Sequence, residues 1–320
     1  MSFSAKVKEE LVKKNGTARH CQIAELSALI YMCGYMVPCR EGGMGLCVQT
    51  ENEAVSQKCF TLLEKNFKID TGVTVSDNPY LKRGSVYAVT VNDQEQVKRI
   101  LQAAKLNVQG EGISDSLCLT DHMVIQNNCC KRAFIRGAFL ASGSISNPEK
   151  SYHLEIVCQT EEKARHIQGA IWAFDIDAKI VLRKRSYVVY MKEGAQIVEL
   201  LGFMGAGVAL MELENIRILK DMRNSVNRKV NCETANIHKT VNAAVKQIED
   251  IRLIEEKMGL DQLTSGLSEV ARLRLEFPEA TLKELGMMLT PQVGKSGVNH
   301  RLRKLSDLAQ ELRGDKEVRL

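Results

Sequence analysis

The chain lacks any hydrophobic run long enough to cross a membrane, and its first residues lack the apolar stretch of a secretory signal. Its 44% hydrophobic and 26% charged residues are typical of a globular protein, and the net charge is only +5. We therefore expect a cytoplasmic protein with no membrane partner. The 320 residues predict roughly two domains, at about 150 residues each.

The ten cysteines lack the spacing of a metal site. No two form a Cys-x-x-Cys pair, the six histidines are scattered, and the adjacent Cys129 and Cys130 have poor geometry for an ordinary disulfide. Others, such as Cys47 and Cys158, lie in apolar stretches. We interpret them as reduced, buried thiols, and we expect no metal site and no cofactor.

Two apolar segments end alike, and both lack an acidic residue before the final glycine. They cover residues 26–34 and 135–143, so that the second glycine follows the first by 109 residues. Each resembles the LAGLIDADG helix of homing endonucleases, in which a carboxylate at that place helps to hold catalytic divalent cations. Here Cys33 and Ser142 stand there, and neither suits Mg²⁺. The nearest upstream acid is Glu25, about two turns back. We expect no catalytic residues.

The elements that follow each glycine repeat in the same order, which predicts two similar α+β units. Small residues such as Ala28 and Gly137 would let the two glycine-ended helices approach closely. In the first unit, the patterns predict strands at 44–49, 72–76 and 85–91 and helices at 51–66, capped by Thr50, and 93–105. In the second unit, they predict strands at 151–158, 178–183 and 186–192 and helices at 160–174, capped by Thr160, and 193–201.

Basic residues without acidic neighbours lie on the last strand pair of each unit. The endonuclease resemblance implies sheets that form a saddle over duplex DNA, where such residues would neutralise phosphates. A solvated hairpin tip is the alternative. The candidate secondary DNA contacts are Lys82, Arg83, Arg183, Lys184 and Arg185, with Arg228 and Lys229 further along the chain.

A glycine-rich stretch at 202–207 predicts a hinge. We predict an N-terminal domain over 1–203, a basic linker over 204–232 and a C-terminal domain over 233–320. An apolar stripe that includes Ile237, Val241 and Ile251 predicts a long helix packed within the C-terminal domain.

Residues 281–305 predict a helix-turn-helix motif. Thr281 and Glu284 form a capping box, Pro291 and Gly294 end the first helix, and Ser296 can cap the second. The second helix has an apolar face and a basic face, and asparagine and arginine can pair with adenine and guanine edges. A generic helical hairpin is the alternative, since the connection is longer than the simplest turn. The predicted DNA-binding residues are Thr281, Lys295, Ser296, Gly297, Asn299, His300, Arg301, Arg303 and Lys304.

Nearly the whole chain resembles the bacterial WhiA family, including residues 148–155, 227–236 and 294–305. The resemblance implies a degenerate, pseudo-two-fold LAGLIDADG-like N-terminal domain of two αββαββα-type units, followed by an all-α helix-turn-helix domain. It also implies a DNA-binding regulator of Gram-positive bacteria, linked to sporulation in some members and to cell division and chromosome segregation more widely.

Three hypotheses for the function follow. The leading one is a non-catalytic, sequence-specific, nucleoid-associated DNA-binding protein that regulates transcription, with duplex DNA as its partner and the transcription machinery or another regulatory protein as a second. An active LAGLIDADG endonuclease is disfavoured by Cys33 and Ser142. In the third, the N-terminal domain is chiefly a protein-interaction platform.

Overall fold

The computed structural model describes residues 1–39, 43–69, 73–77, 85–109, 116–120 and 122–314. The chain divides into two compact units, Met1–Lys220 and Asp221–Leu320. This division lies inside the segment predicted as a linker, 204–232. Within the described ranges, no helix is both long and apolar enough to span a membrane.

The first unit contains two copies of one αββαββα order, which confirms the predicted repeat. The first copy comprises α2 (Arg19–Cys33), β1 (Gly34–Pro38), β2 (Met44–Thr50), α3 (Glu53–Phe67), β3 (Val73–Asp77), β4 (Ser85–Val91) and α4 (Gln94–Ala104). The second comprises α5 (Asn128–Ser142), β7 (Gly143–Ile145), β8 (Leu154–Cys158), α6 (Glu161–Trp172), β9 (Lys179–Arg183), β10 (Ser186–Met191) and α7 (Gly194–Met204). Helix α1 (Phe3–Lys13) precedes them, and β5 (Leu106–Gln109), β6 (Ser116–Leu119) and the short η1 (His122–Ile125) connect them.

Each copy forms an antiparallel four-stranded sheet, ordered β1-β2-β4-β3 and β7-β8-β10-β9. The residue patterns did not identify β1 or β7, which begin at the helix-ending glycines themselves. A Cβ atom at Gly34 would lie 2.4 Å from the Ile30 carbonyl oxygen, and one at Gly143 would lie 2.6 Å from that of Phe139. Glycine is therefore needed because the chain turns from helix to strand within one residue.

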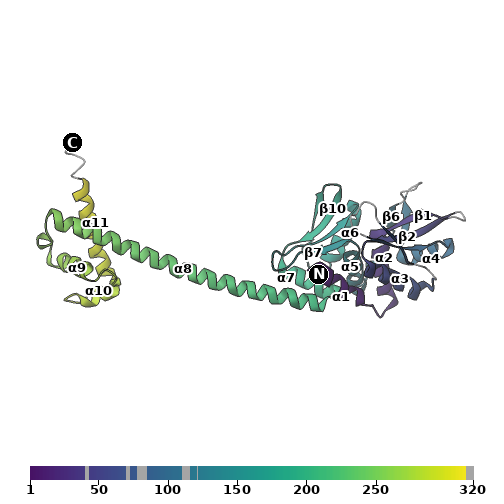
Figure 1. Ribbon diagram of the computed structural model, residues 1–320, viewed down its shortest axis with the longest axis horizontal. Coiled ribbons are helices and arrows are strands. Elements are labelled where there is room, and N and C mark those ends of the chain that lie inside the picture. Colours follow the sequence, from purple (N-terminus) through teal and green to yellow (C-terminus); the bar gives the residue numbers. More distant parts are fainter. Residues whose placement is uncertain (40–42, 70–72, 78–84, 110–115, 121, 315–320) are drawn as a thin grey trace. The chain divides into compact units, whose positions relative to one another are not determined.

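Helices α2 and α5 pack side by side in the core of this unit (Figure 1). Residues 24–32 of α2 are all buried, as are Phe134 and Phe139 of α5. The two helices approach closely at Gly137, where a Cβ atom would lie 2.5 Å from the Glu25 carbonyl oxygen and 2.8 Å from the Ala28 Cβ. The predicted role of small residues between these helices is therefore confirmed at Ala28 and Gly137.

We expect Gly137→Ala to lower the free energy of unfolding by about 1–3 kcal/mol, because the added methyl group meets backbone that cannot rotate away. Urea denaturation would measure the change. Gly169→Ala on α6 is the matched control, since its Cβ would have no neighbour within 4 Å and alanine is the better helix former. Equal stability of the two variants would contradict this account of the helix contact.

Two of the predicted helix caps are wrong. Thr50 still belongs to β2, where it pairs with Tyr87, and the cap of α3 is Asn52, whose side chain accepts a 3.2 Å hydrogen bond from the Val55 amide. Helix α11 (Lys295–Gly314) begins before Ser296, which therefore lies in its first turn. The caps at Thr160 and the capping box of Thr281 and Glu284 are confirmed.

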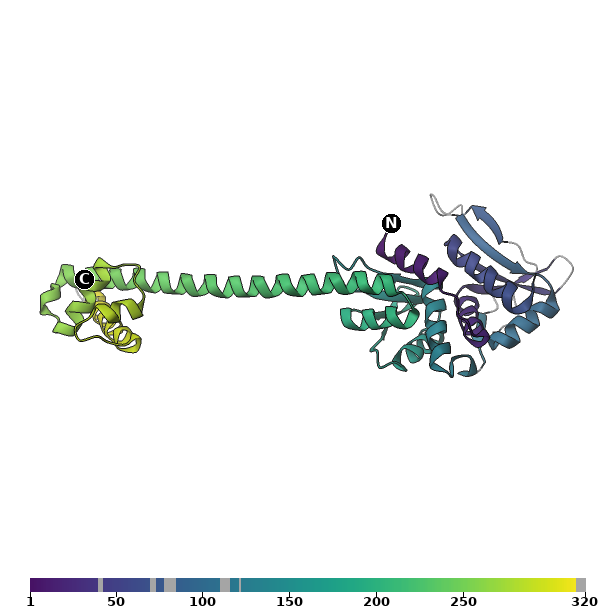
Figure 2. The same cartoon turned by 90° about the horizontal axis from the view of Figure 1, so that it is seen from below.

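The second unit is all-α, as predicted. It contains the end of α8 (Gly207–Lys257), the short η2 (Leu260–Gln262), α9 (Ser265–Glu276), α10 (Leu282–Met288) and α11. The last three helices pack against one another (Figure 2). Their shared core includes Ile254, Val270, Leu285, Val298 and Leu302. Helix α9 was not identified from the sequence.

The predicted hinge and linker belong to regular structure. Gly205, at φ 93°, closes α7, and α8 then runs without a break for 51 residues. The predicted packing of the apolar stripe is wrong for most of its length. Ile251 is fully buried, but Ile237 is 63% exposed and Val241 is 51% exposed.

Candidate nucleic-acid interface

The ends of α2 and α5 hold no anionic ligand. Burial raises the pKa of the Cys33 thiol to about 11, although Lys8 and Lys163 lower it. At neutral pH, Cys33 is therefore a neutral thiol rather than a thiolate. The Ser142 Oγ atom is buried, and it has no hydrogen-bond partner in the part of the chain that the structure describes. The domain is therefore degenerate at both positions where an endonuclease needs a carboxylate.

Positive charge adjoins this degenerate centre. Lys163 is only 5% exposed, and its Nζ atom lies 5.0 Å from the centre of the Tyr31 ring. Burial lowers the pKa of Lys163, while Cys118, Cys33 and Cys158 raise it. A divalent cation bound near Cys33 would meet repulsion from Lys8 and Lys163, in addition to the missing carboxylates.

Glu25, the nearest acid on α2, is bound by other residues. It is fully buried, and its carboxylate oxygens lie 2.9 Å from Lys58 Nζ and 2.7 Å from Arg136 Nη2. Lys58 also donates to the carbonyl oxygens of Leu11 and Val12. Glu25 therefore links α2 to α3 and α5, and it is not a substitute metal ligand.

The outer faces of the two sheets differ in charge over the described residues. On the first sheet, the face opposite the core is uncharged over the described residues Tyr35, Cys47, Gln49, Thr74, Ala88 and Thr90. Lys82 and Arg83, two candidate contacts, lie outside the described residues. The first sheet therefore gives the saddle no support from the residues that can be assessed.

The second sheet carries Lys179 and Arg183 on its outer face, and three of the candidate contacts lie at one hairpin. Arg183, Lys184 and Arg185 are exposed where β9 turns into β10, and Lys184 has a left-handed φ of 58°. Arg183 lies 3.7 Å from Glu155 of β8, on the same face of the sheet. The structure therefore brings these three candidates together at a hairpin tip and not across a continuous basic surface.

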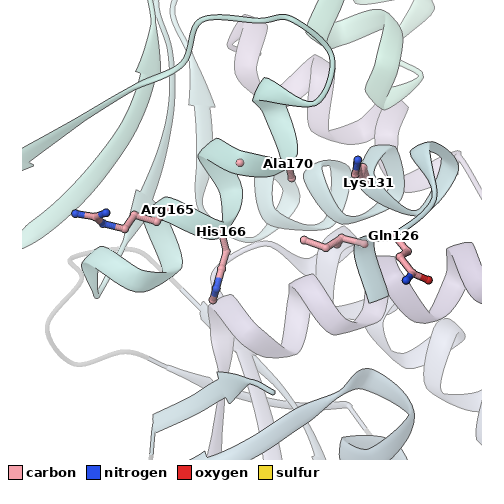
Figure 3. A pocket seen from close by; sticks show the side chains of 7 residues that line it. Gln126, Lys131, Arg165, His166 and Ala170 are labelled. Carbon is pink, nitrogen blue, oxygen red and sulfur yellow. The ribbon is translucent and has the colours of Figure 1, made fainter. Parts of the chain in front are cut away.

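A cavity of about 410 Å³ lies beside α5 and α6 (Figure 3). His166 points from its wall toward α2, where its Nδ1 atom lies 3.0 Å from the Tyr31 hydroxyl. Arg165 is paired with Glu161 at 2.6 Å. The described residues that line this cavity include no nucleophile beside a base.

The segment that connects α10 to α11 packs against both helices of the helix-turn-helix. The Val293 amide donates a 3.0 Å hydrogen bond to the Gly286 carbonyl oxygen. A Cβ atom at Gly286 would lie 2.1 Å from the Val293 carbonyl oxygen, and one at Gly297 would lie 2.3 Å from the Val293 side chain. Gly286 and Gly297 thus let α10 and α11 close on the connection between them. Gly297 therefore has a role in packing, in addition to its predicted role in DNA binding.

Most of the predicted reading residues share the solvent face of α11. Val298, Leu302 and Leu305 are buried on the opposite face, as predicted. Arg301 differs from the rest, because it is half-buried and its Nη1 atom donates a 3.3 Å hydrogen bond to the Gly266 carbonyl oxygen of α9. The exposed candidates on α11 are Lys295, Ser296, Asn299, His300, Arg303 and Lys304. Thr281 is exposed at the start of α10.

The basic residues of α8 fall into two groups. Arg217 pairs with Glu214 at 2.7 Å, and Lys220 donates to the Pro148 carbonyl oxygen at 2.8 Å. The candidates Arg228 and Lys229 are exposed, and Arg228 Nε donates a 3.4 Å hydrogen bond to the Asn224 carbonyl oxygen.

The sequence analysis missed one further group of residues. His20 and Cys21 at the start of α2 lie against Cys129 and Cys130 at the start of α5. The offset of 109 residues that relates Gly34 to Gly143 also relates these two pairs, position by position. That offset was the signal that could have revealed the group, whereas spacing within either half could not.

The fold and the site together define a degenerate LAGLIDADG-like domain joined to a helix-turn-helix domain. Family descriptions match in the same order: the WhiA N-terminal LAGLIDADG-like domain over residues 19–107, the WhiA LAGLIDADG-like domain over 131–223 and the WhiA C-terminal HTH domain over 226–309. The chain belongs to the WhiA family.

Relatives match over their full length. The chain is 52% identical to the "Probable cell division protein WhiA" of Lachnoclostridium phytofermentans, covering 98% of this chain and 100% of the relative. It is 48% identical to that of Clostridium novyi, covering 98% and 99%. The crystal structure of full-length DUF199/WhiA from Thermatoga maritima is similar, with a TM-score of 0.59 and 26% identity over 97% of this chain and 99% of that one.

Proposed function

We propose that this protein is a non-catalytic, sequence-specific DNA-binding regulator. The observation that carries the proposal is the solvent face of α11, where polar and basic side chains are exposed and no acid occurs between Lys295 and Asp307. A helix with such a face, braced by a second helix, fits the major groove of duplex DNA. Magnesium-dependent cleavage of DNA by the purified protein would overturn the non-catalytic part.

The exposed candidate residues fall into two groups, those suited to base contacts and those suited to phosphate contacts. Asn299 and Arg303 lie one turn apart on α11 and can pair with adenine and guanine edges. Lys295 and Lys304 suit phosphate contacts, as do Ser296, His300 and Thr281. Arg301, bound to Gly266, would instead hold α11 against α9. In this proposal, Arg301 is a positioning residue.

The proposed cellular role is regulation of genes for cell division and chromosome segregation, and for sporulation where the organism sporulates. The names of relatives that match the whole chain support the part in cell division, and the rest of the role is what membership of the WhiA family implies. Genome-wide mapping of DNA occupancy tests it, since a nucleoid-associated regulator should occupy discrete sites beside such genes. Uniform occupancy would contradict sequence-specific regulation.

A second candidate function is a protein-docking role for the first unit. The described residues on the outer face of its first sheet are uncharged, which favours this role over a DNA saddle. On this account, the partner is the transcription machinery or another regulatory protein, and DNA is bound chiefly by the second unit.

We expect the charge-reversing double variant Lys184→Glu and Arg185→Glu to bind duplex DNA with an unchanged salt dependence. If the hairpin tip contacted phosphates, losing two contacts would reduce the slope of log affinity against log salt by about 1.8. Affinities at several salt concentrations would distinguish the two outcomes. Lys295→Glu with Lys304→Glu is the matched control that should reduce the slope.

A further inference from the structure

Four side chains with metal-binding atoms meet where α2 and α5 begin. His20 and Cys21 come from the first turn of α2, and Cys129 and Cys130 come from the first turn of α5. Their ligand atoms all lie within 4.8 Å of one another. One nitrogen and three sulfurs form one of the ligand sets that structural zinc sites use.

The distances within this cluster fit one tetrahedral ion. Zinc bonds of about 2.3 Å to sulfur and about 2.0–2.1 Å to nitrogen place a ligand nitrogen about 3.6 Å from each ligand sulfur. The His20 Nδ1 atom lies 3.2 Å from the Cys130 Sγ atom, 3.4 Å from that of Cys21 and 3.9 Å from that of Cys129. The three distances bracket the expected one, so small side-chain movements would suffice.

The surroundings favour bound thiolates. Both helices direct their positive N-terminal ends at the cluster, which stabilises negative charge. Ala24, Val124 and Ala133 pack with Cys130 as an apolar floor. Arg132 lines the same surface cavity as His20, Cys21 and Cys129, and its positive charge would offset the single negative charge of Zn²⁺ with three thiolates.

A bound cation would displace the thiol protons and separate the three thiolates from one another. Cys21, Cys129 and Cys130 are all free thiols, and the adjacent Cys129 and Cys130 have poor geometry for a disulfide with each other.

We propose that His20, Cys21, Cys129 and Cys130 bind a structural Zn²⁺ ion that joins the first turns of α2 and α5. All four ligands come from the protein, so no position stays open for catalysis. The ion would hold the two halves of the pseudo-symmetric unit together at the end opposite Gly34 and Gly143. The proposal is independent of DNA binding.

The test uses the full-length, reduced protein after treatment with a chelator and titration with ZnCl₂ against a chromophoric competitor. We expect one Zn²⁺ per chain, and we expect the double variant Cys21→Ser and Cys129→Ser to lose more than about 100-fold in zinc affinity, since even a partner of a zinc ligand contributes about 10- to 100-fold. Cys39→Ser with Cys232→Ser removes two thiols outside the cluster and should leave the affinity unchanged.

Zinc should also raise the Tm of the wild-type protein by roughly 5–10 °C at a free concentration about 100 times Kd. If the double variant does not fold, the single variant Cys129→Ser, at an exposed position, replaces it in both measurements. Equal zinc affinity of the cluster and control variants would overturn the proposal, as would reduced wild-type protein that binds less than one equivalent. Co²⁺ should give thiolate charge-transfer bands with tetrahedral d–d bands, and their absence would also overturn it.

Discussion

Replacing Arg303 with alanine should weaken binding to a specific duplex by about 1–3 kcal/mol, or roughly 5- to 150-fold in Kd. Arg303 is exposed on the solvent face of α11, and a guanidinium group there can pair with two acceptors of a guanine edge. The base preference at one position of the site should relax at the same time. A gel-shift series at fixed salt, over single-base variants of an occupied site, would measure both effects.

Arg301→Ala is the matched control, because it removes the same side chain from the same helix. The Arg301 guanidinium is bound to Gly266, so its loss should weaken specific and non-specific binding alike and leave the base preference unchanged. Lys304→Ala should reduce the salt slope by about 0.9 without changing the preference. If Arg301→Ala relaxed the preference and Arg303→Ala did not, the assignment of the reading face would be wrong.

The contrast between Arg301 and Arg303 shows what periodicity can predict. Arg301 is three residues from Val298 and four from Leu305, so helical spacing places it beside the buried face. Residue type alone made the two arginines equivalent candidates. Only the three-dimensional position of Gly266 identifies the group that binds Arg301.

The repeated architecture was predictable because two similar glycine-ended helices precede the same order of elements. The short strands β1 and β7 were not predictable from the sequence. Strand β7 has only three residues, and the glycines that begin the two strands, Gly34 and Gly143, are also typical of a helix end. Helix α8 was divided in the prediction because a glycine-rich and then basic composition is typical of a linker. Its middle carries an apolar stripe that includes Ile237 and Val241, but these side chains are exposed, so the stripe predicted packing that the structure does not have.

The cysteine cluster was missed for a different reason. Zinc motifs that can be read from a sequence separate two ligands by a few intervening residues. In this cluster, each of two helices supplies two directly adjacent ligands. Neither pair indicates a site alone, and the packing of α2 on α5 brings them together. Contacts between pseudo-equivalent positions, as at Ala28 and Gly137, are therefore a general property of this helix pair.

Glu25 of α2 and Arg136 of α5 form a buried ion cluster with Lys58 of α3. We expect Glu25→Ala to lower the free energy of unfolding by about 3–5 kcal/mol, because it leaves the positive charges of Lys58 and Arg136 buried without a counter-ion. The loss should be about 3 kcal/mol, at the lower end of this range, because Lys58 keeps its carbonyl partners and Arg136 keeps the Met204 carbonyl oxygen. Urea denaturation should show a lower midpoint at an unchanged slope.

Glu161→Ala is the control, because it breaks an exposed pair with Arg165 and should cost less than about 0.5 kcal/mol. Burial lowers the pKa of Lys58, and the attraction of Glu25 opposes that shift. Without Glu25, the unfolded state, with a lysine pKa near 10.5, binds more protons than the folded state. The stability of Glu25→Ala should therefore rise with pH as Lys58 loses its proton. A pH-independent cost, or one equal to that of Glu161→Ala, would show that the buried charges do not hold α2 against α3 and α5.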